Sequence, residues 1–357
     1  MRTRRLKTTG AWGVSALMAV TVLMMASPTS AQEQLVITSW GGNLLPVQRK
    51  VYFEPFAREA GVKIVEDEWG GELAKLRAMV QAGAASWDVV EVSDAQLQSG
   101  CNEGLLEPID WSKVGGKDKF VADAVHECGV GTSSSSAVIA FNADKITGRQ
   151  PTTLKDFFDP IGFPGPRALR KSPRYNLEVA LLADGVTPAE LYRVLGTEEG
   201  VTRAFRKLDQ LRPHVKVWFT QWAEAIQLLV DGEVYMTMNG NGRVWAAATQ
   251  DKKNLKIIWD NQGAGYDYWA IVKGTKKRDL AHRYIEFASQ DRNMTEFTKL
   301  FRYGPTVNSV IASMPPEIAR DMPSTPDNMK TSYRVSAAFW ADHNDDYTVR
   351  FNAWLAK

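Results

Sequence analysis

The chain has 357 residues, with 43 lysines and arginines against 41 acidic residues and a formal net charge of +2. Residues 1–31 contain four of the cations and no acid, so the other 326 residues carry a net charge of −2. This balance lacks the basic footprint of a nucleic-acid-binding protein and excludes that class. A length of 326 residues exceeds what one hydrophobic core usually holds, so we predict two domains.

Residues 1–31 have the three parts of an export signal. A cationic start with Arg4 and Arg5 is followed by the apolar segment ALMAVTVLMMA, and small residues stand before Gln32. The apolar segment is too short to span a bilayer. We therefore predict that residues 1–31 are removed and that the mature chain begins near Gln32; an uncleaved anchor is the alternative.

Segments of strand and helix length alternate through the first third of the mature chain. Strands are predicted at 35–40, 62–69 and 87–93, and helices at 44–61 and 71–83. This order is typical of an α/β protein with largely parallel sheets. The three strands end at Trp40, Trp69 and Ser93–Asp94, and open α/β folds bind ligands at such carboxyl ends.

The mature chain contains two cysteines, Cys101 and Cys128. In an exported protein, a disulfide between them is the main expectation, and it would contribute about 3 kcal/mol by closing a loop of about 28 residues. Two separate buried thiols are the alternative. A two-cysteine metal site is a weaker one, because His126 is the only histidine nearby and zinc needs a fuller ligand set.

The second half of the chain continues the alternation. The serine-rich strand 133–146 leads to helices at 176–185, 187–196, 197–214 and 221–233, with strands at 215–220 and 234–239. We predict a loop at 239–242, strands at 254–261 and 265–272, and helices at 279–290 and 294–301. No flexible linker separates two domains, so the segments 133–142 and 267–272 are the predicted connections between them.

Catalytic motifs are scarce. The four histidines (His126, His214, His282 and His343) lack the spacing of a zinc site and are expected at the surface, and neither a G-x-S-x-G motif nor a P-loop is present. We therefore predict a protein that is not an enzyme and that has no cofactor or bound metal. A secreted glycoside hydrolase with a tryptophan-lined cleft is the alternative, but the sequence offers no convincing carboxylate pair for it.

Aromatic residues gather near predicted strand ends, and the segment GYDYWAIV places Tyr266, Asp267 and Trp269 together. Aromatic faces attract a cation, and a carboxylate supplies its counter-charge, so this combination predicts an amine-binding wall. Core packing is the alternative for any single tryptophan. Arg174 and Arg243 each stand just before a predicted helix and would suit a carboxylate, although solvated arginines are an equal alternative.

The order of several motifs carries a family resemblance. SWGG, WDVVEVSDAQLQSGCNEGLLEPID, FNADKI, LLVDGEVYMTMNGNGR, DYWAIVKGT and YGPTVN follow an export signal. Together they resemble the periplasmic solute-binding proteins of ABC importers, of the spermidine/putrescine-binding type.

The resemblance implies a type II two-lobed α/β fold with the ligand in the cleft between the lobes. Lobe 1 would comprise residues 32–140 and 267–310, and lobe 2 residues 141–266 and 311–357. The protein would act in the periplasm as a monomer that binds a small amine, a polyamine or a zwitterionic amino compound, and delivers it to a permease in the inner membrane. A metal-ion receptor of related fold is a distant alternative.

The resemblance also implies which residues bind the ligand. Acids would hold its amine groups, and tryptophan and tyrosine rings would cover its methylenes. The implied residues are Trp40, Asp94, Tyr266, Asp267 and Trp269, with Tyr303 near the rim, and Trp69 and Trp222 less securely placed.

Two departures from the polyamine binders bear on the ligand. Those proteins have an Asp and a Glu where this chain has Ser172-Pro173-Arg174-Tyr175, and Gly240 replaces an expected tryptophan. A lost acid pair and an added arginine favour a smaller ligand with one amine and one carboxylate, as in the related γ-aminobutyrate-type binders.

Overall fold

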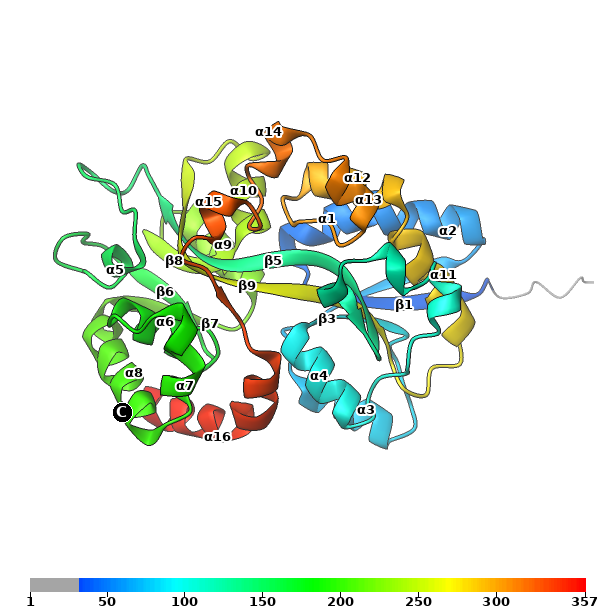
Figure 1. Cartoon of the computed structure of the whole chain (residues 1–357), viewed down its shortest axis with the longest axis horizontal. Helices are drawn as coiled ribbons and strands as arrows, with labels where there is room; N and C mark the ends of the chain where they lie inside the picture. Colours follow the sequence, from blue (N-terminus) through cyan, green and yellow to red (C-terminus); the bar gives the residue numbers. More distant parts are fainter. Residues whose placement is uncertain (1–31) are drawn as a thin grey trace, which may run out of the picture. The chain divides into compact units, whose positions relative to one another are not determined.

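The computed structural model describes residues 32–357 (Figure 1), so the predicted export signal lies outside the described residues. The strands in this part form one mixed sheet in the order β2-β1-β3-β9-β5-β8-β6-β7, in which β10 also pairs with β9 and β4 with β5. The strand bounds are β1 (Gln34–Ser39), β2 (Lys63–Glu68), β3 (Val89–Ser93), β4 (Val125–His126), β5 (Gly129–Asn142), β6 (Arg167–Arg170), β7 (Val215–Phe219), β8 (Met236–Gly240), β9 (Leu255–Ile271) and β10 (Tyr333–Arg334).

The sheet has a parallel group of strands on each side of an antiparallel centre. The first strand group is β2-β1-β3, and the second strand group is β8-β6-β7. Between them, β5 and β9 pair with each other, and β9 pairs with β3 while β5 pairs with β8, all antiparallel. The prediction of a largely parallel sheet is therefore wrong for the centre, where the two segments predicted to connect the domains lie side by side.

Helices cover both faces of each strand group (Figure 1). The helix predicted at 44–61 forms as α1 and α2 with a π-turn between them, and it ends at Gly61, whose φ of 71° suits a residue without a side chain. The helices are α1 (Leu45–Gln48), α2 (Glu54–Ala60), α3 (Leu73–Gln81), α4 (Asp94–Asn102), α5 (Leu154–Phe157), α6 (Asn176–Ala183), α7 (Leu191–Leu195), α8 (Glu198–Leu211), α9 (Trp222–Val230), α10 (Asn241–Thr249), α11 (Arg278–Ala288), α12 (Asp291–Leu300), α13 (Asn308–Ala312), α14 (Pro316–Ala319), α15 (Pro326–Met329) and α16 (Ala337–Leu355). None of these helices is long and apolar enough to cross a membrane.

Two predictions of local structure are wrong. The strands predicted at 254–261 and 265–272 are one strand, β9. Residues 259–262 form a bulge against β5, in which Asn261 has a φ of 55°, and pairing with β5 resumes at Gly263. The loop predicted at 239–242 does not form. Instead, β8 runs directly into α10, so Arg243 lies in the first turn of a helix and not before it.

The predicted disulfide is confirmed, because Cys101 at the end of α4 is bonded to Cys128 just before β5. By contrast, the prediction that the histidines lie at the surface is wrong for His282, which is 1% exposed. Its Nε2 accepts a hydrogen bond from the backbone N–H of Asp110 at 3.0 Å, and its Nδ1 lies 2.8 Å from the carbonyl oxygen of Arg278. These contacts explain how a polar ring can be buried there.

Candidate functional site

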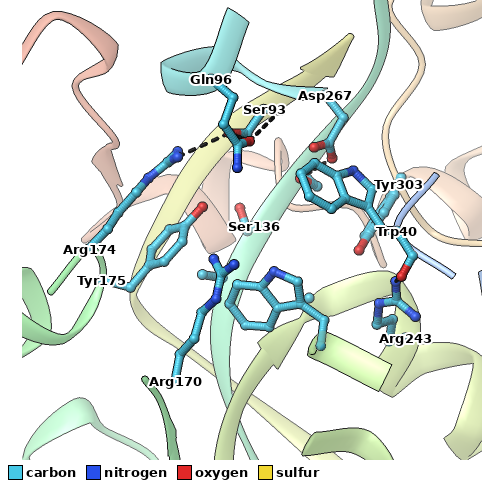
Figure 2. A pocket seen from close by; sticks show the side chains of 14 residues that line it. Trp40, Ser93, Gln96, Ser136, Arg170, Arg174, Tyr175, Arg243, Asp267 and Tyr303 are labelled. Atoms are coloured by element: carbon cyan, nitrogen blue, oxygen red, sulfur yellow. Dashed lines mark hydrogen bonds between the residues drawn. The ribbon is translucent and has the colours of Figure 1, made fainter. Parts of the chain in front are cut away.

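A polar pocket lies where the carboxyl ends of strands from both groups meet the central strands (Figure 2). It encloses about 510 Å³, including its opening to solvent. Its lining comprises Trp40, Ser93, Gln96, Ser135, Ser136, Ala137, Arg170, Arg174, Tyr175, Trp222, Gly240, Arg243, Asp267 and Tyr303.

One side of the pocket is acidic and aromatic. Asp267, on β9, is 8% exposed and accepts a hydrogen bond from Ser135 Oγ at 2.9 Å. Burial raises the pKa of Asp267 to about 6, and the bond from Ser135 and the nearby Trp40 indole oppose the rise. Trp40 and Tyr303 stand beside the carboxylate in Figure 2, so this side combines rings and one negative charge.

The rings of this side have support from behind. Trp40 stacks on Trp69 with ring centroids 5.6 Å apart and an interplanar angle of 15°. Trp69 is held in turn by a hydrogen bond from its Nε1 to the carbonyl oxygen of Glu91 at 3.0 Å. At Gly240, a Cβ atom would collide with the hydroxyl of Tyr303, so the glycine found in place of a tryptophan makes room for that ring.

The opposite side of the pocket is basic. Arg170 ends β6 and Arg174 precedes α6, and both face the Asp267 side in Figure 2. The Arg170 guanidinium lies over the Trp222 ring at 5.0 Å, and its Nη2 donates to the carbonyl oxygen of Gly70 at 2.8 Å. Burial lowers the pKa of Arg170, but arginine remains charged at neutral pH.

Arg174 connects the two strand groups. Its Nη1 donates to Ser93 Oγ at 3.0 Å, and its Nη2 forms an ion pair with Asp94 at 2.9 Å. Burial would lower the pKa of Arg174, but the neighbouring Tyr175 and Asp94 raise it above its ordinary value, so the guanidinium is charged. Within the described structure its Nε is buried without a hydrogen-bond acceptor, as is the hydroxyl of Ser136. Buried polar atoms of this kind are rare in proteins unless a ligand or water meets them.

Arg243 forms a second connection, near the rings. It is 2% exposed, and burial lowers its pKa. Its Nη1 donates to the carbonyl oxygen of Gly41 at 2.9 Å, and its Nη2 donates to that of Trp40 at 3.1 Å. The side chain therefore fixes the segment after β1, which carries Trp40, against the start of α10.

Six of the ten predicted ligand-binding residues line this pocket. They are Trp40, Arg174, Trp222, Arg243, Asp267 and Tyr303. For Arg174 and Arg243, an equal alternative was that their side chains are solvated at the surface. This alternative is wrong, because both side chains are buried.

The other four predicted residues do not line the pocket. Trp69 lies behind Trp40, and Asp94 is turned to Arg174. Tyr266 lines a different cavity, because neighbouring residues on a strand point to opposite faces. Trp269 is 1% exposed and packs edge-on against Tyr284 at 5.4 Å in the core, so for it the core-packing alternative fits the structure.

Eight pocket residues were not among the predicted ligand-binding residues, although Ser93 had been placed at a ligand-binding strand end and Gly240 noted as a departure. They are Ser93, Gln96, Ser135, Ser136, Ala137, Arg170, Tyr175 and Gly240. The run of four serines within the otherwise apolar strand β5 was a usable signal for two of them. Tyr175 has a φ of 72°, an uncommon value for a residue other than glycine, but no sequence pattern indicates it.

Comparisons with known proteins place the chain in a family. The family model described as bacterial extracellular solute-binding protein matches residues 52–324, and the chain belongs to this family. The γ-aminobutyric acid-binding protein of Pseudomonas aeruginosa is 43% identical over 336 residues, which cover 94% of this chain and 95% of that one.

Solved structures agree with this assignment. The PBP AgtB of Agrobacterium tumefaciens R10, in complex with agropinic acid, is 32% identical with a TM-score of 0.83, covering 91% of this chain and 99% of the other. The Atu4243 GABA receptor is 31% identical with a TM-score of 0.77, covering 91% and 98%. The predicted two-lobed α/β fold and the predicted class, a non-enzymatic solute-binding component of an ABC transporter, are confirmed.

Proposed function

We propose that this protein binds a short ω-amino acid of the γ-aminobutyrate type and delivers it to the permease of an ABC importer. The observation that carries the proposal is the charge distribution of the pocket. One buried carboxylate, Asp267, stands among rings on one side, and the guanidinium groups of Arg170 and Arg174 stand on the other. A ligand with an ammonium group at one end and a carboxylate at the other matches both sides.

In this proposal the ammonium group binds between Asp267 and the faces of Trp40 and Tyr303. Asp267 is buried, and among the described residues it forms no ion pair, so the ammonium group supplies a paired cation for a costly buried charge. The rings add cation–π attraction, which strengthens when the site excludes water. The methylenes lie against Trp222 and Tyr175, which pack edge-on at 5.7 Å.

The ligand carboxylate binds Arg170 and Arg174. Arg174 uses both Nη atoms within the protein and has Nε free of protein acceptors among the described residues, whereas Arg170 uses only Nη2 in the hydrogen bonds to Gly70. The hydroxyl of Ser136, which also has no hydrogen-bond partner in the described part of the chain, stands near the middle of the pocket in Figure 2. Charged hydrogen bonds of this kind are among the strongest that proteins form.

The same charges oppose a polyamine. Putrescine carries two ammonium groups, and the pocket lining contains one carboxylate against three arginines. The second ammonium group would meet Arg170 and Arg174 and would be repelled. The relatives named above, two of which are described as binding or receiving γ-aminobutyrate, support the zwitterionic ligand.

We further propose how the protein reaches and holds its ligand. Residues 1–31 act as a cleaved export signal, and the mature protein works in the periplasm as a monomer. Residues 32–140 with 267–310 form lobe 1, and residues 141–266 with 311–357 form lobe 2. The lobes close on the ligand, and the hydrogen bonds of Arg170, Arg174 and Arg243 across the pocket stabilise the closed state.

Isothermal titration calorimetry of the mature protein tests the proposal, with γ-aminobutyrate, putrescine, butylamine and butyrate as ligands. We expect γ-aminobutyrate to bind at least 100-fold more tightly than putrescine, because only the zwitterion satisfies both sides of the pocket. We also expect butylamine and butyrate, which each lack one charge, to bind weakly. Tighter binding of putrescine than of γ-aminobutyrate would overturn the proposal.

A further inference from the structure

A larger cavity adjoins the basic side of the pocket. It has a volume of about 1280 Å³ including its opening to solvent, and it is bounded by α3, α4, the segment 170–174 and α16. Its lining includes Ser99, Lys171 and Asn344. Three residues line both this outer cavity and the pocket: Gln96, Arg170 and Arg174. These three side chains therefore form the wall between the two spaces.

Hydrogen bonds hold this wall across the two strand groups. Arg174 donates to Ser93 Oγ at 3.0 Å, Ser93 Oγ donates to Gln96 Oε1, and Gln96 Nε2 donates to the carbonyl oxygen of Gly71 at 2.8 Å. Beside this chain of bonds, Arg170 donates to the carbonyl oxygen of Gly70 at 2.8 Å. Arg170 and Arg174 are thus fixed by partners that are distant in the sequence. Gln96 is fixed by Gly71 and by Ser93, with which it forms the capping box of α4.

The glycine pair at 70–71 allows the wall to close. At Gly71, a Cβ atom would collide with Gln96 Nε2, and the φ of 93° is one that residues with a side chain rarely adopt. At Gly70, a Cβ atom would lie 2.6 Å from Gln221 Nε2. A larger residue at position 71 would therefore push Gln96 out of the wall, and one at position 70 would displace the neighbouring Gln221.

From this geometry we infer that Gln96, with Arg170 and Arg174, ends the pocket at the ligand's carboxylate and so limits the length of the ligand. The inference rests on the proposed function, which places that carboxylate on Arg170 and Arg174. Arg170 and Arg174 bind the ligand carboxylate, whereas Gln96 is uncharged and only adds bulk to the wall. We therefore assign the limit on ligand length to Gln96. The outer cavity is the space into which a longer ligand would extend.

Replacing Gln96 by alanine tests the inference. The Kd values of γ-aminobutyrate and 6-aminohexanoate are measured by calorimetry for the wild-type protein, Gln96→Ala and Gln98→Ala. Gln98 is a matched control, because it lies on the same helix and lines neither the pocket nor the outer cavity, and its side chain donates a hydrogen bond to Asn102 at 3.0 Å. The melting temperature of each variant establishes that it is folded.

For the wild-type protein and Gln98→Ala, we expect a strong preference for γ-aminobutyrate over 6-aminohexanoate. In Gln96→Ala this preference should fall at least tenfold. An unchanged preference in Gln96→Ala, or a wild-type protein that binds both ligands equally, would overturn the inference while leaving the proposed function intact. A wild-type protein that binds neither ligand would overturn the proposed function itself.

Discussion

The two sides of the pocket are built in different ways. The acidic side rests on regular structure: Asp267 lies within the long strand β9, and Trp40 directly follows β1 and is backed by Trp69. The basic side consists of side chains at the end of β6 and in the turn before α6. Their hydrogen-bond partners are Gly70, in the segment after β2, and Ser93, at the end of β3, so both partners are on the side of the first strand group.

This difference indicates distinct roles in binding. The acidic side needs no contact from the second strand group to hold Asp267 in place, because Ser135 on the paired strand β5 supplies its hydrogen bond. The basic side is complete only when both strand groups are close together. We therefore expect the amine end of the ligand to contribute most of the affinity, and the carboxylate end to contribute selectivity and closure.

The largest effect is expected at the acidic side. Replacing Asp267 by asparagine should weaken γ-aminobutyrate binding about 100-fold, since a lost buried charge-assisted hydrogen bond corresponds to about 3 kcal/mol. Calorimetry of Asp267→Asn against the exposed control Asp251→Asn measures this. Equal affinities for the two variants would remove Asp267 from the site and reverse the comparison.

A smaller and ligand-dependent effect is expected at the basic side. Arg170→Gln should weaken γ-aminobutyrate binding about 20-fold, or about 2 kcal/mol, because the ligand carboxylate loses a charged donor. Butylamine, which has no carboxylate, should lose less than threefold. The exposed Arg193→Gln serves as the control. An equal loss for both ligands would mean that Arg170 supports the fold of the pocket and does not contact the carboxylate.

The pH dependence of binding provides a third test. With the pKa of Asp267 raised to about 6, its carboxylate is mostly ionised at pH 7 and mostly protonated at pH 5, so the Kd of γ-aminobutyrate should rise about tenfold between pH 7 and pH 5. Asp267→Asn should lose this dependence. A flat profile in the wild-type protein would contradict the assignment of the amine to Asp267.

In the protein without ligand, the raised pKa of Asp267 makes the folded state more stable at low pH, whereas ligand binding is expected to be tighter at high pH. Ionising a buried carboxylate destabilises the folded state. The contribution of Asp267 to the free energy of unfolding is therefore fully present below its ordinary pKa near 4, and it is lost as the pH rises through about 6. Urea denaturation at pH 4 and pH 7, for the wild-type protein and Asp267→Asn, measures this difference.

The smallest effect on binding is expected from the disulfide, which lies outside the pocket. Replacing Cys101 and Cys128 together by serine should lower the free energy of unfolding by about 3 kcal/mol, because the bond closes a loop across a sequence separation of 27 residues. The Kd of γ-aminobutyrate should stay within twofold of the wild-type value. A large loss of affinity in a folded variant would show that the acidic side depends on this bond.

Much of the fold followed from local patterns. Trp40, Trp69 and Ser93 were expected at the carboxyl ends of the first three strands, and they lie there because short apolar runs followed by polar residues indicate where strands end. The continuous strand β9 was predicted as two strands. Its bulge contains Asn261 and is followed by Gly263, and asparagine and glycine are also typical of turns, so the local sequence does not distinguish the two outcomes.

The sequence by itself determined the family, the alternation of strands and helices, the disulfide as the main expectation, and Asp267 among aromatic residues as an amine-binding candidate. Only the tertiary structure decided which residues share one pocket. It buried Trp269 in the core, placed Trp69 behind Trp40, and brought Arg174 to Ser93, which is 81 residues away in the chain. Such pairings depend on how strands order themselves in a sheet, and strand order is set by packing across the whole chain and not by the residues adjacent to the site.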